Sequence, residues 1–130
     1  MKALLLNPHK GFELVEANGL NDYYKYLECD CIDITTAMVN GNVVNIIVDD
    51  EGLMKENPVL SAFYVDENET EWEGALAGNL LFCGEADEEG ELTDISKKTA
   101  MYLLTRVRSR VTYDEENGHE LIWHVLLNYY

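Results

Sequence analysis

The sequence predicts an α+β fold, a single domain over residues 1–130 in which a mostly antiparallel sheet of hairpins carries two helices packed on it. Three observations lead to this class. Short apolar and β-branched runs alternate with turn residues. Asn40-Gly41 between two such runs is the strongest hairpin signal in the chain. Two segments place apolar residues at helical spacing, and a chain of this length fits one core.

The first fifty residues are expected to form two hairpins with a short helix between them. Each apolar run there is bounded by Asn, Pro or Gly, the residues that favour turns. The tyrosines of the helix are predicted to pack at the boundary of the core. In chain order we expect strands at residues 2–6 and 12–16, a helix at 20–27, and strands at 31–39 and 43–48.

The middle of the chain is expected to hold one buried strand. Asn57-Pro58 predicts a turn or a short helix that runs to residue 64, and residues 65–73 are predicted as a loop. The apolar run from Leu76 to Cys83 is predicted as the buried strand, and its glycines indicate a bulge or a close backbone approach. A turn around Gly90 follows.

The C-terminal part begins with the second helix. Thr93 or Asp94 is predicted to cap it. The apolar stripe of this helix consists of Ile95, Thr99, Tyr102, Leu103 and Val107. A last hairpin follows from residue 111, although residues 119–128 fit a strand and a helix equally well.

Acidic residues dominate the charge of the chain. The sequence has 25 Asp and Glu against 9 Lys and Arg, a net charge of −16. Solubility alone requires a net charge of about 2 to 8 in magnitude, and excess charge costs stability through self-repulsion. The excess favours binding to a basic partner and excludes direct binding of nucleic acid or anionic membranes. An acidic cellular background is the alternative explanation.

The acids concentrate between Glu56 and Ser96, where twelve occur without one Lys or Arg. Many stand at every second position, and in an extended chain residues i and i+2 lie about 6.5 Å apart on one face. Each run is therefore predicted to form a row of carboxylates, with Trp72 as an apolar anchor or as ordinary packing. The candidate partner-binding residues are Glu67, Glu69, Glu71, Trp72, Glu73, Glu85, Asp87, Glu89 and Glu91.

One basic segment opposes these acids. Lys97, Lys98, Arg106, Arg108 and Arg110 lie in a stretch, between Ile95 and Tyr113, that has no acid. Two roles are open for this segment. It either balances the acidic run of its own chain or forms a homodimer through Lys97 to Arg110.

Catalytic and metal-binding motifs are missing from the sequence. It contains no G-x-S-x-G, P-loop, G-x-G-x-x-G or H-E-x-x-H pattern, and its three histidines are scattered. Residues 87–91 do not match a calcium loop, and Cys29 and Cys31 do not match zinc spacing. We therefore expect no enzyme activity, metal or cofactor. Three cysteines, and no signal or membrane-spanning segment, predict a cytoplasmic protein.

Several turn and strand motifs resemble a known family. They are residues 1–8, 48–53, Asn57-Pro58, 77–84 and 89–94. The family is an uncharacterised small domain of unknown function, carried by phages, plasmids and conjugative elements of Gram-positive bacteria. The resemblance covers about residues 1–105 and leaves 106–130 as a C-terminal addition.

The resemblance implies a genomic context in which small acidic proteins often inhibit host defence. Together with the charge, it predicts an acidic, non-enzymatic binder that occupies the nucleic-acid site of a basic host protein, such as a restriction or CRISPR nuclease. Two alternatives remain open at this point. One is an oligomerising structural module, and the other is a protein that sequesters a small molecule in a cavity near Gly78 and the tyrosines.

Overall fold

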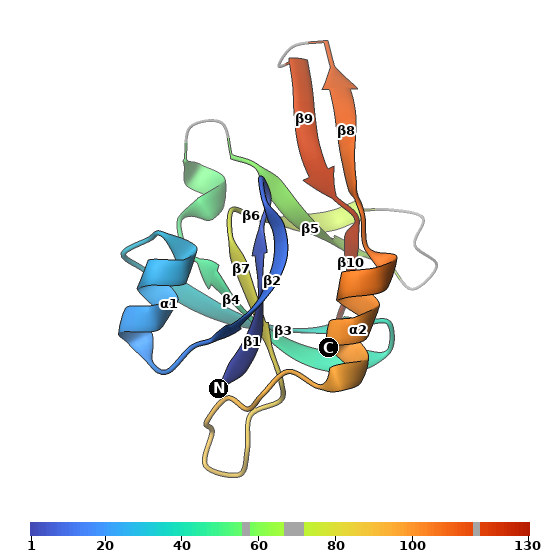
Figure 1. The fold of residues 1–130 in the computed structure, drawn as a ribbon. Helices are drawn as coiled ribbons and strands as arrows, with labels where there is room; N and C mark the ends of the chain where they lie inside the picture. The colour runs from blue at the N-terminus through green and yellow to red at the C-terminus, as the bar shows by residue number, and fades with distance from the viewer. Residues whose placement is uncertain (56–57, 67–71, 116–117) are drawn as a thin grey trace.

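The computed structural model describes residues 1–55, 58–66, 72–115 and 118–130. Two α-helices, ten strands and one short 3₁₀ turn form in these residues (Figure 1). They are β1 (Lys2–Asn7), β2 (Gly11–Glu16), α1 (Leu20–Leu27), β3 (Ile32–Val39), β4 (Asn42–Asp49), η1 (Gly52–Met54), β5 (Leu60–Val65), β6 (Trp72–Ala77), β7 (Leu80–Cys83), α2 (Lys97–Arg106), β8 (Ser109–Asp114), β9 (Gly118–Trp123) and β10 (Val125–Tyr129).

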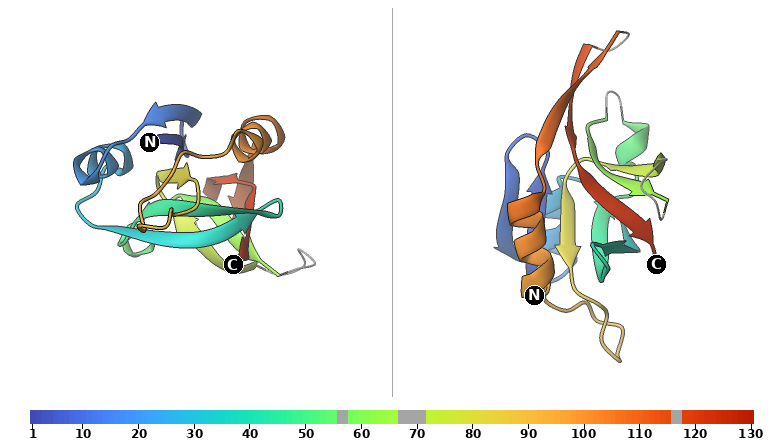
Figure 2. Two further views of the ribbon diagram at one scale, coloured as in Figure 1. Left: turned by 90° about the horizontal axis from the view of Figure 1, so that it is seen from below. Right: turned by 90° about the vertical axis from the view of Figure 1, so that its right-hand side faces the viewer.

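Eight strands form one sheet in the order β2-β1-β7-β4-β3-β10-β5-β6. The strand pairs in this sheet are antiparallel except for β10 and β5, which run parallel. β8 and β9 form a separate two-stranded sheet that projects from the body of the molecule (Figures 1 and 2). The predicted α+β class with a mostly antiparallel sheet is confirmed.

Local turn chemistry explains the elements that the sequence predicts best. Asn40 and Gly41 both have positive φ angles, 50° and 78°, so they form the tight turn that matches the twist of β3 and β4. β1 and β2 pair from Lys2 opposite Glu16 to Asn7 opposite Gly11. Both hairpins are confirmed, as is the helix over residues 20–27.

The core lies on both faces of the sheet, as the alternation of side chains along β1 shows. Leu4 and Leu6 pack in a cluster that includes Leu103 of α2, whereas Ala3 and Leu5 pack in a second cluster with Leu27 of α1. Successive side chains of a strand point to opposite faces, so one strand supports both helices. Tyr23 and Tyr26 of α1 are partly buried against the second cluster, as predicted.

The prediction of a single buried strand from Leu76 to Cys83 is wrong, because this run contains parts of two strands. Gly78 has a φ angle of +77°, a conformation that glycine adopts without strain, and it ends β6 before β7 begins. β6 lies at the edge of the sheet next to β5, while β7 lies between β1 and β4. The apolar run therefore serves two places in the sheet, and its uniform hydrophobicity hides the turn.

Two neighbouring predictions also need correction. The turn or helix after Pro58 is instead strand β5, which pairs with β6 on one side and β10 on the other. The prediction of a loop over residues 65–73 is wrong at both ends. Val65 belongs to β5, and Trp72 and Glu73 are the first two residues of β6. Residues 67–71 lie outside the described part of the chain.

The second helix begins at a different cap from the predicted ones. The Oγ of Ser96 accepts a hydrogen bond from the backbone N–H of Thr99 at 3.2 Å, so Ser96 is the N-cap. Asp94 instead accepts a hydrogen bond from the backbone N–H of Lys2. The apolar stripe is confirmed at Thr99 and Leu103, which are buried beneath α2.

The C-terminal residues form three strands, which decides the open question over residues 119–128 in favour of strands. β10 enters the interior of the main sheet between β3 and β5, and Val125 and Leu127 are 0 % exposed. Trp123, at the end of β9, donates from its indole Nε1 to the Pro8 carbonyl at 2.9 Å and stacks edge-on against Phe12. These contacts hold the base of the projecting hairpin.

Candidate functional site

The loop between β7 and α2 carries four of the predicted partner-binding residues. We call residues 84–94 the acidic loop; Figures 1 and 2 show it extending from the body on the side away from the β8–β9 hairpin. Its exposed acidic residues are Glu85, Asp87, Glu88, Glu89, Glu91 and, at its end, Asp94. Glu88 was not singled out from the sequence, because it falls between the alternate positions of the predicted row.

The base of the acidic loop is closed by backbone and side-chain hydrogen bonds. The N–H of Gly84 donates to the Thr93 carbonyl at 2.9 Å, and the hydroxyl of Thr93 donates to the Glu85 carbonyl at 2.6 Å. Ala86 and Leu92 form an antiparallel bridge above these bonds. The loop is therefore a narrow hairpin.

The tip of the loop is organised by Asp87. Its Oδ1 accepts hydrogen bonds from the backbone N–H groups of Glu89 and Glu91, both at 2.9 Å. Its own N–H donates to the Glu91 carbonyl at 2.8 Å, and Gly90 has a φ angle of +83°. The predicted turn around Gly90 is confirmed. Asp87 shapes this turn with one oxygen, whereas its neighbours direct their carboxylates to solvent.

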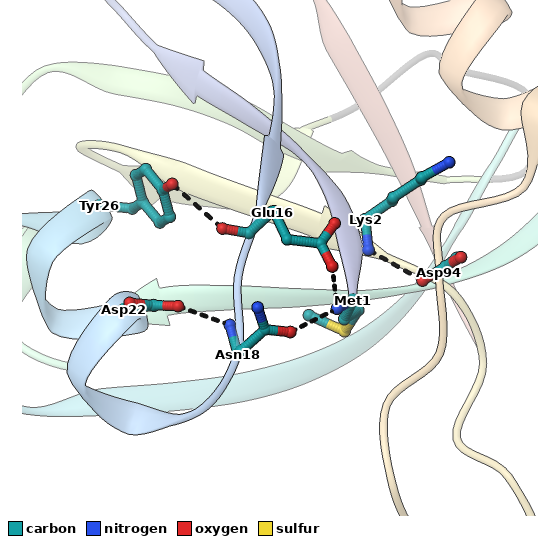
Figure 3. A network of polar contacts seen from close by, with 7 residues as sticks. All are labelled: Met1, Lys2, Glu16, Asn18, Asp22, Tyr26 and Asp94. Carbon is teal, nitrogen blue, oxygen red and sulfur yellow. Dashed lines mark hydrogen bonds and ion pairs between the residues drawn. The ribbon is translucent and has the colours of Figure 1, made fainter.

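The loop is also tied to the first strand. The Asp94 carboxylate accepts from the N–H of Lys2 at 2.8 Å (Figure 3), and the N–H of Ile95 donates to the Lys2 carbonyl at 2.9 Å. The same end of β1 is held by the Met1 amino group, which donates to Glu16 at 3.0 Å and to Asn18 at 2.7 Å (Figure 3). The C-terminal end of the acidic loop is therefore anchored to β1.

The charges of the loop are not neutralised within the described chain. The ion pairs recorded among the described residues join the Met1 amino group to Glu16 and Lys55 to Asp49. Neither pair involves the acidic loop or the basic segment from Lys97 to Arg110. Both charged regions are exposed to solvent, so both are available to other molecules.

The other predicted residues lie elsewhere. Glu73 is exposed on edge strand β6, whose start is separate from the acidic loop in every view (Figures 1 and 2). Trp72 opens β6, but its side chain lies outside the described part, as do Glu67, Glu69 and Glu71. The structure thus gathers the second run of acids on one loop and sets Glu73 apart, but the turn at Gly90 replaces the predicted row of carboxylates on one face of an extended chain.

A family model for a domain of unknown function, DUF3846, matches residues 1–108. The chain belongs to this family. No curated protein and no solved structure matches it. The DUF3846 match includes the acidic loop and α2 but ends immediately before β8. Because β10 lies inside the sheet, part of the core of this DUF3846 protein comes from beyond the matched residues.

This DUF3846 protein has a groove near Gly78 and Tyr24, in the region where the small-molecule alternative expects a cavity. Two adjoining depressions of about 380 and 230 Å³ share Glu28, Asp49 and Lys55. Tyr24 lines the larger depression, and Gly78 lines the smaller one with Pro8, Pro58 and Asn79. The groove gathers turns that are distant in sequence, and spacing alone did not single out its charged residues Glu28, Asp49 and Lys55.

Two charged residues that line both depressions, Asp49 and Lys55, are paired with each other. The Asp49 carboxylate accepts from Lys55 at 2.5 Å and from the N–H of Glu51 at 2.9 Å. Its hydrogen bond raises the pKa of Lys55. Burial, and then the charge of Asp49, raise the pKa of the nearby Cys29 thiol. Cys29 is therefore a neutral thiol at neutral pH.

Among the described residues, no three His, Cys, Asp or Glu side chains converge to hold a metal ion. Neither described helix is long and apolar enough to cross a membrane.

Proposed function

We propose that this DUF3846 protein is a non-enzymatic binding protein of a phage, plasmid or conjugative element of Gram-positive bacteria. It occupies the nucleic-acid site of a basic host protein, such as a restriction or CRISPR nuclease, and inhibits it. The acidic loop supplies carboxylates where the host protein otherwise binds phosphates.

The observation that carries this proposal is the acidic loop itself. Glu85, Glu88, Glu89 and Glu91 project from a narrow hairpin, and no described cation pairs with them. Duplex DNA carries about one negative charge per 1.7 Å of its axis, and a basic cleft attracts any comparable density of negative charge. A net charge of −16 strengthens that attraction at long range.

The rigidity of the loop supports binding as well. A flexible acidic segment loses conformational freedom when it binds, which weakens its affinity. Here Asp87 fixes the tip, while Gly84 and Thr93 close the base. The loop therefore presents its charges with little further ordering.

A pull-down from a host lysate tests this proposal. The full chain serves as bait at low and at high salt, and the bound proteins are identified. We expect a nucleic-acid-binding nuclease, or one of its subunits, that is released by salt and displaced by duplex DNA. A captured partner that duplex DNA does not displace contradicts mimicry, as does the recovery of no nucleic-acid-binding protein.

A further inference from the structure

One face of α2 carries exposed cations beside exposed apolar side chains. Lys97 and Lys98 are exposed, and Met101 and Leu104 are 57 % and 44 % exposed. The two lysines lie one turn before Met101, and Leu104 lies one turn after it, so all four share one face of the helix. We call these four residues the outer face of α2. The buried residues of α2 lie on the other side of the helix, against the main core.

The outer face is left uncovered by the described part of the chain. The ion pairs recorded in this part join other residues, and neither lysine takes part in them. Met101 and Leu104 belong to neither core cluster. Residues 95–112 contain no acid, so the surroundings of the outer face are basic as well. The outer face therefore favours an acidic occupant.

The acidic loop matches the outer face in charge and in length. Glu88 and Glu89 are exposed at its tip. Each arm of the loop has about five residues and spans about 16 Å, at about 3.3 Å per residue. α2 has ten residues, which span about 15 Å at about 1.5 Å per residue. One acidic loop can therefore lie along the whole of α2.

The acidic loop of a chain does not reach the outer face of the same chain. The hydrogen bond from the Ile95 N–H to the Lys2 carbonyl fixes the point where the loop ends, just before α2 begins. From there the loop extends beyond the N-terminal end of α2, away from the helix (Figures 1 and 2). An acidic loop that covers the outer face has to belong to another molecule.

We infer that two copies of this chain associate, with the acidic loop of each copy lying on the outer face of α2 of the other. Negative charge in the loop is followed by positive charge on α2 along one side of the molecule, so two copies match when they lie antiparallel. The two-fold axis passes close to Ser96, which lies between the loop and the helix. The contact forms twice and closes as a dimer.

This inference does not rest on the proposed function, since it requires only copies of this chain. The second copy covers the loop that the host protein would bind, so the two compete for it. Each copy carries a charge of −16, which opposes association at long range. At about 0.15 M salt, charges more than about 8 Å apart are largely screened, whereas charges in contact still attract each other.

Charge reversal on each side of the contact tests the inference, by sedimentation equilibrium of the full chain at about 0.15 M salt. The helix variant is Lys97→Glu, Lys98→Glu. The loop variant reverses the exposed glutamates of the acidic loop, Glu85→Lys, Glu88→Lys, Glu89→Lys and Glu91→Lys. We expect the wild type to dimerise, and the dissociation constant to rise about tenfold or more in each variant. An equimolar mixture of the two variants is expected to form heterodimers, because each loop then meets an outer face of opposite charge.

A matched control separates the contact from the net charge. Lys10→Glu, Lys25→Glu reverses two exposed lysines elsewhere, and it is expected to dimerise as the wild type does. Two reversals of two charges each take the net charge from −16 to −20 in this control and in the helix variant. Glutamate is favourable in the first turn of a helix, so the helix variant is expected to fold. Circular dichroism confirms that each variant is folded.

Met101→Ala tests the apolar part of the outer face. The truncation removes apolar surface that the dimer buries, so the dissociation constant is expected to rise about threefold or more. Met54→Ala is the control, because Met54 is 79 % exposed and lies in η1, apart from α2 in every view (Figures 1 and 2). The dissociation constant of this control is expected to equal that of the wild type.

Three results overturn the inference. One is a wild-type chain that stays monomeric at its highest soluble concentration. Another is a mixture of the loop and helix variants that forms no heterodimer. The third is equal weakening of the dimer by the helix variant and by its matched control. The helix variant keeps the acidic loop unchanged, so its capture of a host protein reports on the proposed function alone.

Discussion

Gly84 lies so close to the Asp94 backbone that a side chain has no room between them. A Cβ atom built on Gly84 would stand 2.3 Å from the Asp94 carbonyl oxygen and 2.7 Å from the Thr93 hydroxyl. The neighbouring atom is backbone, which cannot rotate away as a side chain does. Gly84 therefore permits the close base of the acidic loop.

The variant Gly84→Ala is accordingly expected to lower the free energy of unfolding by about 1 to 3 kcal/mol, the typical cost of overpacking. Denaturant titration measures this change. Gly74→Ala is the control, because its Cβ would meet its nearest neighbours at ordinary contact distances of 3.6 and 3.7 Å. Equal stability losses in the two variants would refute the close approach at Gly84.

Asp87 is expected to contribute to the acidic loop mainly by fixing its shape, and less by its negative charge. Asp87→Ala removes the acceptor of two backbone N–H groups, at a cost of about 1 kcal/mol for each hydrogen bond. Hydrogen exchange of the Glu89 and Glu91 amides is then expected to accelerate about tenfold. Glu88→Ala is the control, because it removes the same charge without removing an acceptor of these amides. Exchange of the Glu89 and Glu91 amides is expected to stay unchanged in Glu88→Ala, and equal acceleration in both variants would contradict the prediction.

The free energy of unfolding is expected to decrease at alkaline pH because of Cys83. Burial raises the pKa of its thiol to about 12, and its Sγ donates to the Asn45 carbonyl at 3.3 Å. The unfolded chain loses this proton above a pH of about 8.5, while the native state keeps it. The unfolded state then binds fewer protons, so the free energy of unfolding decreases by about 1.4 kcal/mol per pH unit.

This decrease is measured by denaturant titration at pH values up to 10. Cys83→Ala is expected to flatten the slope, and Cys31→Ala at the exposed cysteine leaves it unchanged. An identical slope in the wild type and in Cys83→Ala would show that the thiol ionises equally in both states. Burial also raises the pKa of Cys29, so a part of the slope that does not depend on Cys83 remains in every variant.

β10 is expected to be essential for folding although it lies beyond the family match. Leu127→Ala removes a fully buried side chain from the main core and should cost about 2 to 5 kcal/mol. Leu126→Ala, at the adjacent half-buried position, is the matched control and should cost less. Thermal unfolding of both variants measures the difference, and a chain that tolerates Leu127→Ala as well as Leu126→Ala would exclude this role.

Local signals account for the parts of the fold that the sequence predicted. The hairpin at Asn40 and Gly41 needs two positive φ angles in succession, and these two residue types adopt them readily. The helix at residues 20–27 follows from apolar spacing alone. The acidic loop was predicted as a turn because Gly90 and the surrounding acids lie within a few residues of one another.

Long-range pairing accounts for the parts that were missed. β6 and β7 are adjacent in sequence, yet four strands separate them in the sheet. The parallel pairing of β10 with β5 joins residues more than sixty positions apart, such as Val125 and Ala62. Hydrophobic patterns indicate that such strands are buried, but they carry no information about the neighbour beside which each strand lies.

The central claim is that the acidic loop binds the host protein in place of nucleic acid. The most direct measurement compares the wild type with a triple variant, Glu85→Lys, Glu89→Lys and Glu91→Lys, in the salt-dependent pull-down. A control variant reverses three exposed acids elsewhere, Glu13→Lys, Asp30→Lys and Asp50→Lys. Three reversals of two charges each take the net charge from −16 to −10 in both variants.

Because the two variants have the same net charge, any difference in partner binding between them comes from the position of the reversed acids. We predict that the triple loop variant loses the partner that duplex DNA displaces, while the control variant retains it. Retention of that partner by the loop variant, or equal loss in both variants, would contradict the claim.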